Sequence, residues 1–187
     1  METREQMDVL ASLAIGVVPK AMIALVLLGK KPSVELDLFI HSPSPDTIQS
    51  ELERIGLVVL PVCGKKINER HTGTFAISLE RNLATILAEV ATMREQNSGK
   101  STRDLYYSLY CSLLGYPLSA IDGFISNRML SEESELYPET VKGNMLLVFK
   151  LSIDHWEQEM ETLIAWERAL QRAAPKILDE LYSVIVR

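Results

Sequence analysis

The spacing of hydrophobic residues along the chain of 187 residues predicts a mixture of helices and strands. Residues 4–28 form one long apolar helix in this prediction, which ends at a glycine, a residue type that commonly terminates helices. Residues 34–40 alternate between apolar and polar side chains, which is typical of a strand. Ser44, followed by a proline at the first helical position, predicts a helix over residues 45–55.

The middle of the chain predicts a hairpin and then several helices. Two short apolar runs, 57–62 and 74–79, are expected to be its strands, joined by a polar connection over residues 65–72. Leu, Ile and Val at helical spacing over 79–93 predict the next helix. Two more helices are predicted over 101–114 and 118–127, separated by a glycine and a proline.

The last third of the chain predicts one more strand and a long helical region. Residues 145–153 are rich in strand formers, and the helical pattern that follows is interrupted at Pro175. From 34 to 153 the element order is β-α-β-β-α-(helices)-β, the order of a ferredoxin-like split βαβ unit with a helical insertion. We therefore predict one α+β domain over residues 1–187, with a small antiparallel or mixed sheet, a buried N-terminal helix and long C-terminal helices.

One segment raises the question of a membrane span. Residues 9–28 are almost entirely apolar and long enough to cross a bilayer. However, Lys20 lies near the centre, where an unpaired lysine costs about 2.5–3.5 kcal/mol on insertion scales, and Pro19 interrupts the helical hydrogen bonds. We predict a kinked core helix, while the basic pair Lys30 and Lys31 leaves membrane association as the alternative.

Composition places the chain among ordinary globular proteins. Hydrophobic residues make up 47% and charged residues 24%, which argues against disorder. The net charge of −6 gives no bulk attraction to nucleic acid or to an anionic membrane. Cys63 and Cys111 share no CxxC spacing, so we expect two free thiols in a reducing, cytoplasmic setting.

The polar hairpin connection carries most of the candidate functional residues: Lys65, Lys66, Glu69, Arg70 and His71. The basic side chains of this group could bind a small anionic ligand, with arginine providing a bidentate contact. Glu69 and His71 lie on the same face if the backbone is extended, and such a pair could transfer a proton. The competing interpretation is a solvated hairpin loop, because polar loops are more common than functional ones.

Other motifs are weaker. The sequence from Gly99 to Thr102 is similar to the end of a phosphate-binding P-loop, but it lacks the first glycine and follows a helix instead of a strand. Residues 102–128 have the rhythm of a helix-turn-helix, yet the second helix offers Asp122 where a DNA-binding helix needs basic or amide side chains. The three histidines show no metal-binding spacing, and we predict neither a metal nor a cofactor.

Two further features bear on binding. Apolar residues in steps of four and three over residues 156–186 form a heptad-like pattern, which predicts either packing on the chain's own sheet or self-association. Among four tyrosines near the helix over 101–114, Tyr107 is predicted to be the exposed one and is a candidate ligand contact, whereas Tyr106 and Tyr110 share a face with core residues.

No family is recognised from these residues. The patterns favour a non-catalytic protein-interaction or ligand-binding module, with a homodimer through residues 156–186 as one form. One alternative is a small enzyme or anion-binding protein that uses residues 65–72. The other is a regulator that uses residues 102–128.

Overall fold

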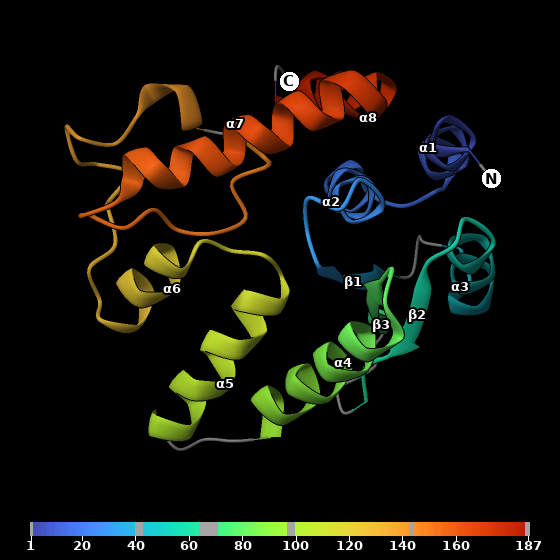
Figure 1. Ribbon diagram of the computed structural model, residues 1–187, viewed down its shortest axis with the longest axis horizontal. Coiled ribbons are helices and arrows are strands. Elements are labelled where there is room, and N and C mark those ends of the chain that lie inside the picture. The colour runs from blue at the N-terminus through green and yellow to red at the C-terminus, as the bar shows by residue number, and fades with distance from the viewer. Residues whose placement is uncertain (1, 40–42, 64–70, 97–99, 143, 186–187) are drawn as a thin grey trace.

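The computed structural model describes the chain except residues 1, 40–42, 64–70, 97–99, 143 and 186–187 (Figure 1). The described residues form an α+β fold, as predicted. Its helices are α1 (Thr3–Ser12), α2 (Val17–Leu27), α3 (Pro45–Arg54), α4 (Arg81–Gln96), α5 (Lys100–Leu113), α6 (Leu118–Ile125), the 3-10 helix Glu139–Val141, α7 (Trp156–Ala173) and α8 (Pro175–Ile185). Its strands are β1 (Ser33–Phe39), β2 (Val58–Pro61) and β3 (His71–Ser78).

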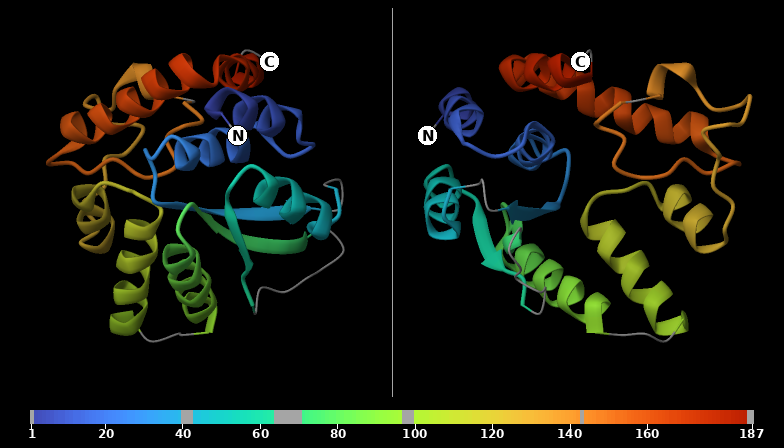
Figure 2. Two further views of the ribbon diagram at one scale, coloured as in Figure 1. Left: turned by 45° about the vertical axis from the view of Figure 1, so that its right-hand side comes forward. Right: turned by 180° about the vertical axis from the view of Figure 1, so that it is seen from behind.

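The three strands form one antiparallel sheet in the order β1-β3-β2. Leu36 of β1 lies opposite Phe75 of β3, and Leu60 of β2 lies opposite Ala76. Figure 2 shows α2 on one side of this sheet and α4 on the other. Side chains alternate along each strand, so the sheet contributes to a core on each of its faces. Leu36 lies in the core beneath α2, and Ala76 lies in the core beneath α4.

The strand predicted over residues 145–153 is wrong. These residues form no strand, and one isolated bridge joins Ser152 to Met129. Asn144 turns the chain at the start of this segment, where its side chain accepts a hydrogen bond from the backbone N–H of Leu146. Leu146 and Leu151 are buried in the main core, so the apolar residues that suggested a strand are used for packing. The six-element ferredoxin-like order is therefore incomplete.

The predicted N-terminal helix is two helices. α1 ends at Ser12, and α2 begins at Val17 after a short extended connection. Pro19 lies in the first turn of α2, where no N–H is needed for the helical hydrogen bonds, so it starts a helix instead of kinking one. Lys20 is buried and donates to the carbonyl of Ala11 and to the Glu180 carboxylate.

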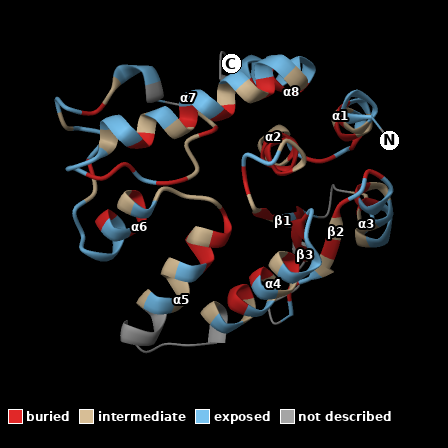
Figure 3. Cartoon of the chain, in the orientation of Figure 1, coloured by how far each residue is buried: buried red, intermediate tan, exposed pale blue. Residues whose placement is uncertain are grey.

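No helix in the described part of the chain combines the length and the apolar character needed to cross a membrane. The apolar residues of α2 serve instead as the centre of the main core, and Figure 3 shows this helix buried along most of its length. α2 packs against α8, α7 and β1. The prediction of a buried core helix in this region is thus confirmed.

The helical break at Pro175 is confirmed, because α7 ends at Ala173 and α8 begins at Pro175. The apolar pattern of both helices faces the chain's own core, where Leu163, Leu170 and Leu181 are buried. The main core and a second core beneath α4 and α5 meet at Tyr116, which packs against both.

Gly115 makes the turn between α5 and α6 possible. Its φ angle is +73°, a region that L-residues avoid, and a Cβ atom here would lie 2.8 Å from Cδ of Pro32. Gly29 has a similar φ angle of +63°, but a Cβ atom there would meet nothing within 4 Å. Comparing substitutions at the two glycines therefore distinguishes the cost of backbone strain from the cost of a steric clash.

We expect Gly115→Ala to lower the free energy of unfolding by about 1 kcal/mol more than Gly29→Ala. The left-handed conformation alone should cost about 1–2 kcal/mol at either position, whereas only Gly115→Ala must also displace the Pro32 ring. Urea denaturation of both variants measures the difference. Equal losses would show that the chain relaxes around Pro32 without cost.

Candidate functional site

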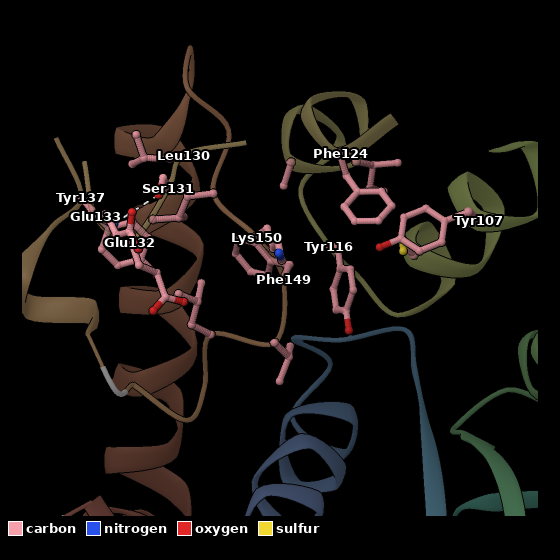
Figure 4. Close-up of a pocket in the computed structure, with 16 residues that line it drawn as sticks. Tyr107, Tyr116, Phe124, Leu130, Ser131, Glu132, Glu133, Tyr137, Phe149 and Lys150 are labelled. Atoms are coloured by element: carbon pink, nitrogen blue, oxygen red, sulfur yellow. Dashed lines mark hydrogen bonds between the residues drawn. The ribbon is translucent and has the colours of Figure 1, made fainter. Parts of the chain in front are cut away.

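A cavity of about 680 Å³ lies between α5, α6 and the segment that leads into α7 (Figure 4). We call it the aromatic cavity. Its walls come from chain segments far apart in the sequence: Tyr107, Cys111, Tyr116, Ala120, Ile121, Phe124, residues 130–133, Tyr137 and residues 147–151. The turn at Gly115 brings the first two helices together, and the segment before α7 closes the other side.

Aromatic rings cover one side of this cavity. Tyr107 of α5 stacks on Phe124 of α6, with ring centroids 4.4 Å apart and an interplanar angle of 18°. Tyr116 lies against Phe149 at 5.7 Å, and Phe149 meets the edge of Trp166 at 6.0 Å. Tyr107 is half-buried in this stack, so the prediction that it is exposed is wrong, although it does line a cavity.

Polar groups cover the opposite side. Ser131, Glu132 and Glu133 are exposed residues that line the cavity, and Tyr137 is buried beside them. Figure 4 shows the two glutamates across the cavity from the aromatic residues of α5 and α6, with Lys150 between the two groups. The cavity therefore has an apolar, aromatic side and an acidic side.

The thiol in the cavity wall is poorly suited to nucleophilic chemistry. Burial raises the pKa of Cys111, while a hydrogen bond with Tyr107 opposes that effect. Burial also raises the pKa of the Tyr107 and Tyr116 hydroxyls. Because the thiolate is the reactive form of cysteine, these neutral groups suit binding better than catalysis.

A second, smaller cavity of about 230 Å³ adjoins the first and shares Tyr116 and Val148 with it. We call it the lysine cavity, because Lys31 lines it from the connection between α2 and β1. Lys31 is only 4% exposed. Its Nζ atom donates a hydrogen bond to the carbonyl of Leu114 and lies 4.2 Å from the centroid of the Trp166 ring.

The charge on Lys31 is costly in this position. Burial lowers the pKa of its ammonium group to about 7, and the nearby Cys111 opposes this only in part. Sequence reasoning missed this residue, since the basic pair Lys30–Lys31 was interpreted only as a sign of membrane association. No spacing in the sequence distinguishes the exposed Lys30 from the buried Lys31.

Most of the predicted hairpin site cannot be placed. Lys65, Lys66, Glu69 and Arg70 lie outside the described residues. The backbone of His71 begins β3 opposite Phe39, but its side chain lies outside the description as well. Anion binding or proton transfer by this group stays a prediction.

Metal binding finds no support in the described part of the chain, which contains no cluster of three or more His, Cys, Asp or Glu side chains suited to a metal ion. Comparison of the chain with protein-family models, with curated proteins and with solved structures gives no match. The function must therefore be argued from the two cavities themselves.

Proposed function

We propose that this protein binds a small amphipathic molecule in the aromatic cavity, with a flat apolar body and a cationic end. The observation that carries this proposal is the opposition of the Tyr107–Phe124 stack to Glu132 and Glu133 across one cavity. A concave, mainly apolar site with a few polar groups at one side is the usual form of a small-molecule site. Ligand binding agrees with the sequence prediction of a non-catalytic module.

The volume of the cavity suits this proposal. At about 680 Å³ it falls within the range of roughly 300–1,000 Å³ that is typical of small-molecule sites. A planar ring system could pack against Phe124 and Phe149, since offset and edge-to-face aromatic contacts are both favourable. Such contacts add to the burial of apolar surface and orient the ligand.

The charge of the cavity favours a cation over an anion. Glu132 and Glu133 contribute two carboxylates, against the single ammonium group of Lys150. The whole chain is also acidic, with a net charge of −6, so its long-range field attracts cations. The two glutamates are exposed, and we expect them to select the ligand more than to increase its affinity.

The aromatic side of the cavity can be tested with 2-naphthylmethylamine, followed by the fluorescence of its ring. We expect Phe124→Ala to weaken its binding by about tenfold, since one good aromatic contact and its buried area are worth about 1.4 kcal/mol. Leu118→Ala is the matched control, because Leu118 is on the same helix, 70% exposed and outside the cavity. Equal affinity for both variants, or no binding to the unaltered protein, would refute the proposal.

The acidic side is tested by changing only the charge of the probe. Naphthalene-2-methanol has the same ring but no charge, so we expect it to bind less tightly than the amine at low salt. Replacing Glu132 and Glu133 together by glutamine should bring the two affinities to within about twofold of each other, because exposed pairs contribute about 0.2–1 kcal/mol each. A preference for the amine that survives both substitutions would argue against this role.

A further inference from the structure

Lys31 combines two properties that are rarely found together in a structural lysine. Its side chain is almost completely buried, yet it lines the lysine cavity. The other walls of that cavity are mainly apolar, from Val18, Pro19 and Met22 at the start of α2 and from Leu114 and Val148. An ammonium group is poorly solvated among such walls, whereas a neutral amine is tolerated.

Groups that bear on the chemistry of Lys31 come from several of the elements around it. β1 contributes the carboxylates of Glu35 and Asp37 to the same cavity, and α5 contributes Tyr110 and the nearby Cys111. The rings of Tyr116 and Trp166 lie 5.0 Å and 4.2 Å from Nζ. Carboxylates and aromatic faces favour the ammonium form, but burial is the larger effect, and it lowers the pKa of Lys31 to about 7.

We propose that the ε-amine of Lys31 forms an imine with a small aldehyde or ketone that enters the lysine cavity. Lysines that are desolvated in apolar pockets are the usual nucleophiles of this reaction. The volume of about 230 Å³ lies below the usual range for drug-sized ligands, so the carbonyl compound would have only a few carbon atoms. This inference does not depend on ligand binding in the aromatic cavity.

The reaction balances without any oxidant or reductant. The lone pair of the neutral amine attacks the carbonyl carbon, and the C=O π electrons move to oxygen. A proton passes from nitrogen to that oxygen and gives a carbinolamine. The hydroxyl group then takes up a proton from solvent and leaves as water, while the nitrogen lone pair forms the C=N bond of an iminium ion. The iminium nitrogen returns its remaining proton to solvent, so the amine and carbonyl compound have become an imine and water.

The hydrogen bond to Leu114 is compatible with this step. A neutral amine has two N–H groups and one lone pair, and the Leu114 carbonyl needs only one of the N–H groups. The lone pair is therefore not used by the hydrogen bond to Leu114. A neutral imine nitrogen has no N–H and loses this contact, whereas the protonated imine keeps one N–H that can still donate to Leu114.

The test is to incubate the protein with propanal and sodium cyanoborohydride, which reduces an imine to a stable secondary amine. Mass spectrometry of the digested protein then gives the labelling rate at each lysine. At neutral pH we expect Lys31 to be labelled at least about tenfold faster than Lys30, its exposed sequence neighbour. A free lysine with a pKa near 10.4 is almost wholly protonated under these conditions, so the buried amine has a large advantage in its neutral fraction.

Two further measurements keep the result from depending on a single variant. In urea-unfolded protein the rates at Lys30 and Lys31 should become equal, because the cavity is lost and the sequence is unchanged. Lys31→Met should remove the fast label, whereas Lys30→Met should leave it. Labelling of Lys31 that is no faster than that of Lys30 in folded protein, or a preference that persists after unfolding, would overturn the inference.

Discussion

Glu159→Ala is expected to lower the free energy of unfolding by about 3 kcal/mol. Glu159 is only 1% exposed, and its carboxylate accepts two hydrogen bonds from Ser152, one from the backbone N–H at 2.7 Å and one from Oγ at 2.6 Å. Alanine would leave the buried N–H of Ser152 without this partner. Since Ser152 ends the segment that forms one wall of the aromatic cavity, binding of 2-naphthylmethylamine should weaken as well.

Two variants distinguish the loss of the Glu159–Ser152 hydrogen bonds from a general effect of removing a negative charge. Glu157 lies in the same first turn of α7 but is exposed, so Glu157→Ala should change stability by less than about 0.5 kcal/mol. Glu159→Gln can still accept from the N–H of Ser152 and can donate to its Oγ, so it should lose less than half as much as Glu159→Ala. Urea denaturation gives all three values. Similar losses of unfolding free energy for Glu157→Ala and Glu159→Ala would show that the Glu159–Ser152 hydrogen bonds do not stabilise the fold.

The start of α7 shows how far capping signals can be carried from sequence to structure. Asp154 and Glu157 are spaced like a capping box at the start of this helix, but they do not cap it. The N-cap is His155, and Asp154 forms an ion pair with Arg128 at 2.7 Å. The hydrogen bonds from Ser152 to Glu159 connect the preceding segment to the first turn of α7. Their spacing of seven residues matches no local capping pattern.

Helices and the hairpin were predictable because their signals are local. Ser44 caps α3, as expected from its place before a proline, and Gly115 lies just after the end of α5 at Leu113. The segment 145–153 was not predictable, because periodicity alone cannot separate a strand from an extended stretch that is packed by helices. Whether such a segment joins a sheet depends on a partner strand, which is a property of the whole fold.

The candidate site was still less predictable than the fold. Among the predicted site residues, Tyr107 is the one whose side chain the structure describes, and it lines the aromatic cavity by stacking on Phe124 from another helix. Lys31 is buried because α2, α5 and α7 meet around it, and this depends on contacts more than 80 residues apart in sequence, such as that with Leu114. Its functional interest comes from burial, which composition and spacing do not encode.

The lowered pKa of Lys31 also leads to a prediction of how the free energy of unfolding depends on pH. In the folded protein its pKa is about 7, whereas in the unfolded chain it should be near 10.4. Between these values the unfolded chain binds more protons, so the free energy of unfolding rises with pH, by at most about 1.4 kcal/mol per unit. Below the folded pKa both states are protonated, and the contribution of Lys31 to the slope disappears.

Lys31→Met should therefore abolish most of this rise, whereas Lys30→Met should preserve it. The clearest window is from about pH 7 to about pH 8, because a free cysteine is half ionised near pH 8.5. Burial raises the pKa of Cys111, so the Cys111 thiol destabilises the folded state as pH increases and opposes the effect of Lys31.

Burial raises the pKa of Tyr110 and Tyr116 too, so both stay protonated throughout the window. The carboxyl groups of Glu35 and Asp37 line the same cavity as Lys31 and are present in both variants. Urea denaturation across the window measures the slope for each variant. If Lys31→Met kept the slope of the unaltered protein, another group would have to be its source, and the neutral amine on which imine formation depends would lose its main thermodynamic support.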